Sequence, residues 1–156
     1  MPRQPSAQAI QTDQPVPDFS WVDINGKNGH INDFKGKTII LNFWASWCAP
    51  CIKEFPALIK AAQDNKDNVV LLALSSDIDD AAIKKFIAKQ DINTKTTNIV
   101  IARDGDQNVT GGMFQTFKLP ETILIAPDQT MRHKFIGADW APEDLQQWIE
   151  KLQTAR

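Results

Sequence analysis

The fold is decided by one stretch of the sequence, which reads Thr38-Ile39-Ile40-Leu41-Asn42-Phe43-Trp44-Ala45-Ser46-Trp47-Cys48-Ala49-Pro50-Cys51-Ile52-Lys53-Glu54-Phe55-Pro56. Its first part is rich in β-branched and apolar residues, which predicts a buried strand over 38–44. The second part carries apolar residues at helical spacing, from Ile52 through Phe55 to Leu58. The only two cysteines of the chain, Cys48 and Cys51, lie where the strand gives way to the helix.

Two cysteines with two residues between them, in the first turn of a helix, indicate thiol–disulfide chemistry. A thiolate at Cys48 would lie at the helix N-terminus, where free N–H groups and the helix dipole stabilise negative charge. Such a setting lowers a thiol pKa from about 8.5 toward about 7, which produces a nucleophile at neutral pH. Cys51, one turn further in, is expected to be the shielded resolving thiol. Pro50 suits the first turn, because its missing N–H would have no helical partner there.

The alternatives are a structural disulfide and half of a zinc site. A structural zinc site needs about four ligands, and the sequence has no second cysteine pair, while His30 and His133 are isolated from it. A disulfide that closes so short a loop adds little entropic stability. We therefore favour redox chemistry, with no metal and no cofactor other than the Cys48–Cys51 disulfide.

Length and composition limit the other possibilities. A chain of 156 residues is expected to form one domain with a proper core. The net charge of −2 gives no electrostatic basis for binding nucleic acid. No run of apolar residues is long enough for a membrane span. Residues 1–15 lack periodicity and are expected to be a disordered tail or linker remnant before a domain at 16–156.

The tail also lacks the apolar segment of a signal peptide. The protein is therefore either cytosolic or has lost a signal or membrane anchor. Periodicity and turn residues also predict the other elements. A hairpin is expected over about 19–31, and strands at 38–44, 68–74, 98–102, 121–126 and 131–136. Helices are expected at 48–65, at 81–90, weakly at 107–117 where Gly111-Gly112 interrupts the pattern, and from about 141.

The chain resembles the extracytoplasmic TlpA/ResA/CcmG branch of thioredoxin-fold proteins. The resemblance is carried by these segments: Pro17-Asp18-Phe19, Asn25-Gly26-Lys27, Phe34-Lys35-Gly36-Lys37, residues 41–56 and Leu119-Pro120-Glu121-Thr122. It implies an α/β thioredoxin-like fold, with a mixed central sheet, helices on both faces, an N-terminal hairpin and one inserted helix. Asn42 occupies the position where cytosolic thioredoxins have a buried aspartate, as is common in the extracytoplasmic branch.

Glu54 is the most informative residue outside the cysteine pair. It lies three residues after Cys51, so on a helix both side chains share one face. A carboxylate there can move protons on and off the resolving thiol, and its charge raises a neighbouring thiol pKa. It also matches the glutamate of the ResA-like CxxCxxEFP pattern. The alternative is an ordinary solvated helix residue.

The remaining candidate residues are substrate contacts. Pro120 matches the family's cis-proline loop, in which the preceding peptide pairs with a substrate backbone, so Leu119 would lie on the substrate side. The alternative is a strand-opening proline in an ordinary turn. Glu121 is a second acidic candidate, and an exposed strand residue is its alternative. Beside the cysteines we expect contacts from Trp47, Ala49 and Pro50, with Trp47 exposed and Trp44 in the core.

The cysteine pair and its surroundings predict a monomeric thiol–disulfide oxidoreductase, and the resemblance implies that it acts outside the cytoplasm. Cys48 would attack a substrate disulfide and Cys51 would resolve the mixed disulfide, after which an upstream membrane thiol reductant restores the enzyme. The resemblance suggests apocytochrome c as the client, because its CxxCH cysteines must be reduced before haem attachment. Two alternatives remain: an oxidase or isomerase that donates disulfides, and a Cu(I)-delivery module that uses the two thiolates.

Overall fold

A six-stranded mixed sheet forms the centre of the molecule. The computed structural model describes residues 13–153. The strands lie in the order β1 (Gln14–Pro15), β8 (Thr130–Ile136), β7 (Glu121–Ile125), β4 (Thr38–Trp44), β5 (Val69–Ser75) and β6 (Ile99–Arg103). Strands β4, β5 and β6 are parallel, whereas β7 is antiparallel to β4, and β8 and β1 continue the antiparallel half. All seven residues of β4 are buried, because both faces of the sheet are covered.

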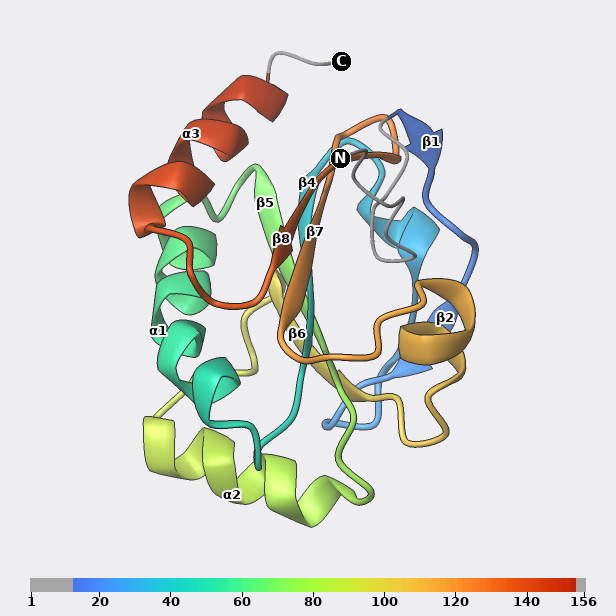
Figure 1. Ribbon diagram of the computed structural model, residues 1–156, viewed down its shortest axis with the longest axis vertical. Coiled ribbons are helices and arrows are strands. Elements are labelled where there is room, and N and C mark those ends of the chain that lie inside the picture. Colours follow the sequence, from blue (N-terminus) through green and yellow to red (C-terminus); the bar gives the residue numbers. More distant parts are fainter. Residues whose placement is uncertain (1–12, 154–156) are drawn as a thin grey trace, which may run out of the picture.

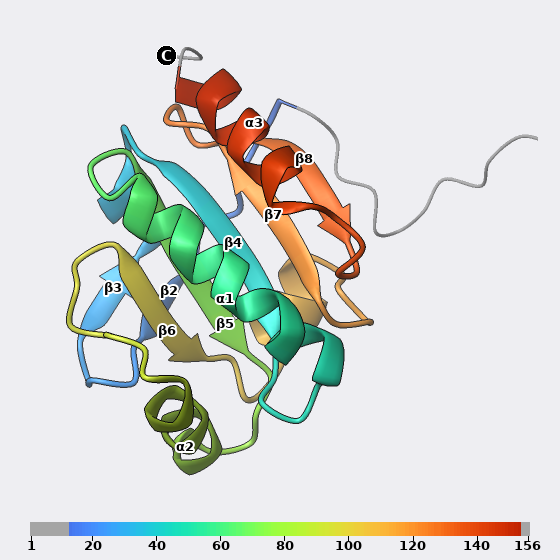
Figure 2. The same cartoon turned by 90° about the vertical axis from the view of Figure 1, so that its left-hand side faces the viewer.

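The two faces of the sheet are covered differently (Figures 1 and 2). Helices α1 (Ala49–Asp64) and α3 (Pro142–Gln153) lie on one face, and α2 (Asp80–Gln90) packs at its lower end. The other face carries the hairpin of β2 (Ser20–Val22) and β3 (Asn28–His30) with the short helical turns η1 (Ile31–Phe34) and η2 (Asn108–Met113). The predicted thioredoxin-like fold with helices on both faces is confirmed, although on the second face they are single short turns.

Alternation along β4 separates two hydrophobic cores and positions the site. Ile40 and Trp44 join the core under the three α-helices, where Trp44 packs on Phe55 with ring centroids 4.6 Å apart. Ile39, Leu41 and Phe43 join the core under the hairpin. Because successive side chains of a strand point to opposite faces, Asn42 faces α1.

The sequence places most elements within one or two residues of their observed ends. Cys48 is the N-cap of α1, and the helix continues without a break through Pro56 to its cap at Asn65. Two expectations are wrong. The helix expected over 107–117 is only the six-residue turn η2. Residues 14–15, assigned to the tail, pair with β8 as strand β1, while residues 1–12 of that tail lie outside the described residues.

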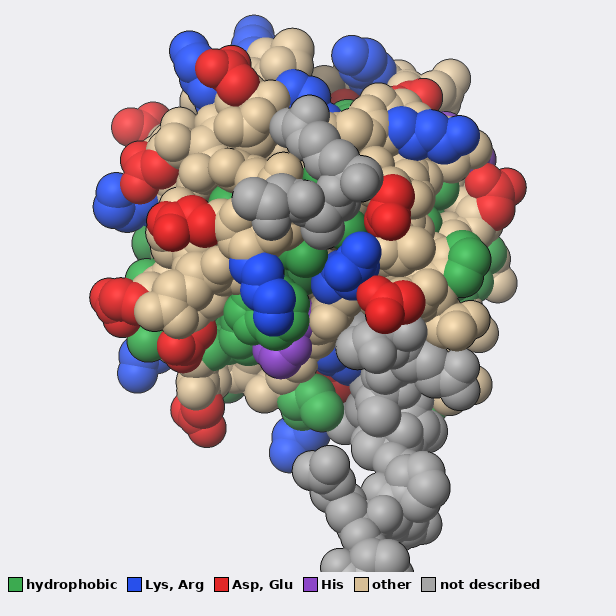
Figure 3. Space-filling model, turned by 90° about the horizontal axis from the view of Figure 1, so that it is seen from above, with side chains coloured by type: hydrophobic (Ala, Val, Ile, Leu, Met, Phe, Trp, Pro, Cys, Tyr) green, Lys and Arg blue, Asp and Glu red, His purple; other side chains and the backbone are tan. Residues whose placement is uncertain are grey.

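No helix within residues 13–153 combines the length and the apolar character needed to cross a membrane. At the end of the molecule opposite the start of α1, acidic and basic side chains are interspersed over the visible face (Figure 3). That face therefore carries no single-sign field of the kind that attracts nucleic acid.

Candidate active site

The two cysteines form a disulfide at the junction of β4 and α1. Cys48 and Cys51 are bonded with their Cα atoms 5.3 Å apart, and the Cys48 Sγ also accepts a hydrogen bond from the Cys51 N–H at 3.4 Å. Cys48 is 7% exposed, whereas Cys51 is completely buried. This asymmetry follows from helix geometry, because Cys48 caps the helix and Cys51 lies one turn inside it. An attacking group can therefore reach Cys48 before Cys51.

A buried aspartate anchors the loop that leads into Cys48. Asp77, at the end of β5, accepts hydrogen bonds from the Ser46 N–H at 2.9 Å and from the Ser46 hydroxyl at 2.6 Å. The Ser75 hydroxyl also donates to Asp77, which is only 2% exposed. Asp77, Asp79 and Asp80 precede the helix predicted over 81–90, and their acidic side chains at its N-terminal end predict capping and solvation. This interpretation holds for Asp79, the N-cap of α2, but is wrong for Asp77.

Glu54 lies on the buried face of α1, and each of its carboxylate oxygens accepts a hydrogen bond. The amide of Asn42 on β4 donates to its Oε1 at 3.0 Å, and the indole N–H of Trp140 donates to its Oε2 at 3.0 Å. The same Asn42 amide donates to the Thr122 hydroxyl of β7 at 3.0 Å. Glu54 is 6% exposed, so the alternative of a solvated helix residue is wrong.

Burial dominates the acidity of Glu54. Desolvation raises the pKa of Glu54 from 4.5 to about 7, against the smaller lowering effects of the hydrogen bonds from Asn42 and then Trp140. A group with this pKa both takes up and releases a proton near neutral pH. It occupies the same helix face as Cys51, one turn further along. The site therefore combines a buried sulfur with a buried carboxyl group whose pKa is raised.

A groove of about 550 Å³ runs beside the first two turns of α1. Its walls come from the helix and from the loop between β8 and α3, and it is lined by Ala49, Pro50, Lys53, Glu54, Ala57, Ala138, Asp139, Trp140 and Pro142. Ala49 and Pro50 are exposed at one side of this groove. The groove thus gives solvent a route to the vicinity of Glu54.

The loop before β7 brings the predicted proline to the same end of the sheet. The Leu119–Pro120 peptide bond is cis, as the resemblance implies. The carbonyl of Pro120 accepts a hydrogen bond from the Gly137 N–H at 2.9 Å, which fixes the loop to the end of β8. Pro120 is buried, and Leu119 is half-buried and packs against both hydrophobic cores.

Glu121 does not join the group around Glu54. Its alternation on β7 turns it to the opposite face of the sheet, because it pairs with Phe43 while Thr122 pairs with Asn42. There Glu121 Oε2 accepts from the Thr116 hydroxyl at 2.6 Å and forms an ion pair with Lys134 Nζ at 3.0 Å. The Glu121 side chain is 0% exposed, so the alternative of an exposed strand residue is wrong.

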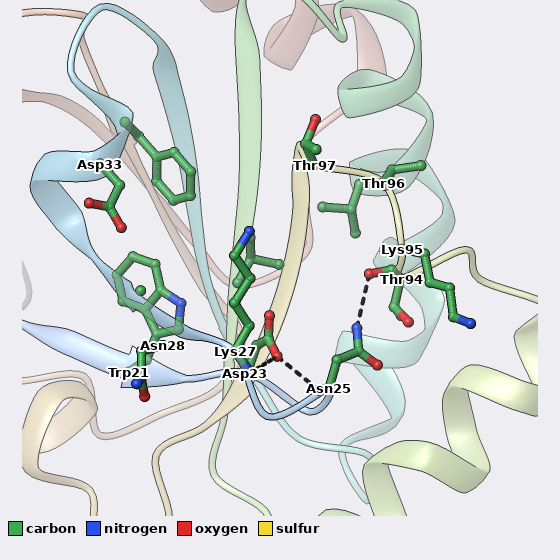
Figure 4. A pocket seen from close by; sticks show the side chains of 14 residues that line it. Trp21, Asp23, Asn25, Lys27, Asn28, Asp33, Thr94, Lys95, Thr96 and Thr97 are labelled. Atoms are coloured by element: carbon green, nitrogen blue, oxygen red, sulfur yellow. Dashed lines mark hydrogen bonds between the residues drawn. The ribbon is translucent and has the colours of Figure 1, made fainter.

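A second pocket lies away from the disulfide, between the hairpin and the loop before β6 (Figure 4). It measures about 710 Å³, and the stacked rings of Trp21 and Phe34 lie among its lining residues. The carboxylate of Asp23 there accepts from the N–H groups of Asn25 and Lys27, so it serves its own turn. Among the described residues, no group of three or more His, Cys, Asp or Glu side chains could hold a metal ion.

Two residues of the site are missed by sequence reasoning. Trp140 lies in a short loop, and nothing in the sequence around it indicates a contact with Glu54, which lies 86 positions earlier. For Asp77 the sequence holds a signal, because polar residues just beyond the carboxyl end of a parallel strand lie at the edge where sites gather. Of the predicted residues, Cys48, Cys51, Ala49, Pro50 and Glu54 are brought together on α1, with Trp47 exposed beside them.

Comparison with known proteins agrees with this geometry. Residues 11–148 match the Redoxin family model. The thiol–disulfide oxidoreductase ResA of Bacillus anthracis is 31% identical over 146 residues, which cover 93% of this chain and 80% of ResA.

Two solved structures extend the comparison to the fold. A thiol:disulfide interchange protein from Bacteroides sp. is 27% identical with a TM-score of 0.74, covering 97% of this chain and 95% of that one. A Chlorobium tepidum structure assigned as the interchange protein DsbE has a TM-score of 0.81 at 24% identity, covering 93% and 99%. The chain belongs to the Redoxin family, as a ResA-like thiol–disulfide oxidoreductase of thioredoxin fold.

Proposed function

We propose that this oxidoreductase works as a disulfide reductase on protein substrates, with Cys48 as nucleophile, Cys51 as resolving thiol and Glu54 as the proton carrier. The observation that carries the proposal is the pairing of a fully buried Cys51 with the buried carboxyl of Glu54 on one helix face. The site is proposed to act outside the cytoplasm, in keeping with the branch that the sequence resembles.

The reaction balances through the dithiol form. The Cys48 thiolate attacks one sulfur of a substrate disulfide, forming a mixed disulfide and releasing the other sulfur as a thiolate that takes a proton from water. Cys51 then gives its proton to ionised Glu54 and attacks the Cys48 sulfur, expelling the second substrate thiolate. Two electrons pass to the substrate, and the Cys48–Cys51 disulfide is the product. An upstream dithiol reverses these steps to restore the enzyme.

The electrostatics favour a reductant over a strong oxidant. Strong oxidants of this class have a stabilised reduced form with a very acidic thiol. Here Glu54 lies on the same face of α1 as the cysteines, and when it is ionised its negative charge opposes thiolate formation. The reduced form is therefore less stabilised, which lowers the reduction potential.

Exposed apolar side chains near the site suit a protein substrate. Trp47 is 69% exposed next to Cys48, and Phe117 is 73% exposed two residues before Leu119. Large exposed aromatic residues are typical anchors of protein interfaces. Apocytochrome c, with its CxxCH cysteines, is the client proposed from the family resemblance, and a membrane thiol reductant is the proposed donor.

The decisive experiment is the reduction potential of the Cys48–Cys51 pair, measured by equilibration in glutathione or dithiothreitol buffers. We expect a value near or below about −220 mV, and a value near about −120 mV would overturn the reductase in favour of a disulfide donor. A disulfide-bonded CxxCH peptide then tests the client. Cys51→Ser should trap a mixed disulfide with this peptide, whereas Cys48→Ser should trap none.

A further inference from the structure

Glu54 is the buried carboxyl that the proposed reaction uses, and its two oxygens accept hydrogen bonds from residues of two different structural elements. Asn42, which binds Oε1, belongs to the central strand. Trp140, which binds Oε2, belongs to the loop between β8 and α3 and is half-buried. An ionised carboxylate only accepts hydrogen bonds, so both N–H groups favour its ionised form.

Trp140 also forms part of the wall between Glu54 and solvent. Its ring packs on Phe135 with centroids 5.5 Å apart, and it lines the groove beside α1. The ring thus has two opposite effects on Glu54. Its apolar body excludes water, which favours the protonated carboxyl, while its N–H group donates to Oε2, which favours the carboxylate.

We propose that Trp140 is a positioning residue that sets, through its hydrogen bond to Oε2, the pH at which Glu54 exchanges its proton with Cys51. This inference deepens the proposed function and rests on it for the role of Cys51. Trp140 belongs to the loop before α3, so one side chain both lines the groove and donates a hydrogen bond to the Glu54 carboxyl.

The ionisable surroundings of Glu54 leave this role to a neutral donor. Lys53 and Asp139 line the same groove, with opposite charges and with side chains that are not buried. From the sheet side the neighbours are the neutral Asn42 and its partner Thr122. From the helix the ionisable neighbour is Cys51, which does not titrate while the disulfide is closed.

The first test is the substitution Trp140→Phe, which removes the N–H donor and keeps an aromatic ring on Phe135. The carboxyl of Glu54 is titrated by carbon-13 NMR in the oxidised protein, so the readout needs no substrate. We expect the midpoint to rise by about one pH unit, because a hydrogen bond to a charged group is lost. An unchanged or lowered midpoint overturns the inference.

Trp148→Phe is the matched control. Trp148 lies on α3, and its ring stacks on His133 at 4.5 Å and carries Lys151 above it. Its substitution should leave the Glu54 midpoint unchanged. Replacement of Trp140 by 3-benzothienylalanine, a tryptophan shape without the N–H, gives the same test if the Phe variant fails to fold.

A second measurement asks whether Trp140 acts through Glu54. The pH profile of mixed-disulfide resolution should move upward in Trp140→Phe by the same amount as the NMR midpoint. In a Glu54→Gln background, Trp140→Phe should add no further shift, and a shift there overturns the inference. If the NMR midpoint moves but the protein reduces no disulfide, the proposed function fails while the control of Glu54 by Trp140 stands.

Discussion

Ser46 donates two hydrogen bonds to Asp77, one from its backbone N–H at 2.9 Å and one from its hydroxyl at 2.6 Å. The pair joins the loop before Cys48 to the end of β5, although the two residues are 31 positions apart. The direction in which Cys48 faces solvent therefore depends on a carboxylate in the loop after another strand.

Asp77→Asn should destabilise the protein and slow disulfide reduction. The carboxylate of Asp77 accepts hydrogen bonds on both oxygens, whereas an amide replaces one oxygen by an N–H₂ group. A donor that faces this group loses its acceptor, which costs about 1–3 kcal/mol. Chemical unfolding and reduction of a peptide disulfide measure the two effects. Asp79→Asn is the control, because Asn caps a helix as well as Asp does. Equal stability of the two variants would contradict the anchoring role of Asp77.

The raised pKa of Glu54 predicts how stability depends on pH. The folded protein retains the Glu54 proton up to about pH 7, whereas the unfolded chain releases it near 4.5. Between these values folding binds an extra proton, so the stability contribution present below pH 4.5 is lost as the pH rises through 7. The loss is on the order of 3 kcal/mol.

Glu54→Gln should lack this component. Urea unfolding of the oxidised wild type and variant at about pH 4.5, 6 and 8 provides the comparison. The variant should gain stability relative to wild type across this range, whatever its absolute value. Parallel stability curves would show that Glu54 titrates normally.

The ion pair between Glu121 and Lys134 predicts strong coupling in a double-mutant cycle. Both side chains are at most 4% exposed, so removing one side of this ion pair deprives the other buried charge of its counter-charge and costs up to about 3–5 kcal/mol. Glu121→Gln and Lys134→Met should each destabilise strongly, while the double variant should recover much of the loss. In the double variant Gln still accepts from the Thr116 hydroxyl. Additive effects in equilibrium unfolding would refute the coupling.

Trp47→Ala should weaken binding of protein substrates without impairing the chemistry. Loss of an exposed aromatic anchor is expected to raise KM for a protein disulfide about tenfold. The rate with oxidised glutathione, which is too small to cover the same surface, should change little. Val22→Ala, on the exposed side of the hairpin, is the control and should alter neither value. A matching loss with both substrates would assign Trp47 to the thiol chemistry instead.

The local parts of this site could be predicted from the sequence, and the long-range parts could not. Cys48, Cys51 and Glu54 are related by helix periodicity, which is visible in a single segment. The hydrogen bond from Trp140 to Glu54 depends on the path of the loop between β8 and α3, and no sequence periodicity predicts that path.

Glu121 shows the same limit within a strand. Strand alternation predicts that Glu121 and Thr122 face opposite ways, but not which of them faces α1. That choice depends on the register with β4, where Thr122 lies opposite Asn42. By contrast, the shortening of the weak helix expected over 107–117 has a local cause, because Gly111 and Gly112 interrupt it and lower its helix propensity, which leaves only η2.

Segments from the N-terminal part of the chain pair along both sides of the sheet, over β8 on one side and over β6 on the other. Gln14 and Pro15 lie along β8, and Pro15 has no N–H to offer to a further strand. At the other edge, Asp23 bridges Ala102, and the Ile24 N–H donates to the Ile101 carbonyl at 3.0 Å. An uncovered sheet edge can pair with an extended segment of another chain as an extra strand. These short covers leave fewer free backbone groups along the two edges, so an extended chain from another protein has less opportunity to pair with the sheet there.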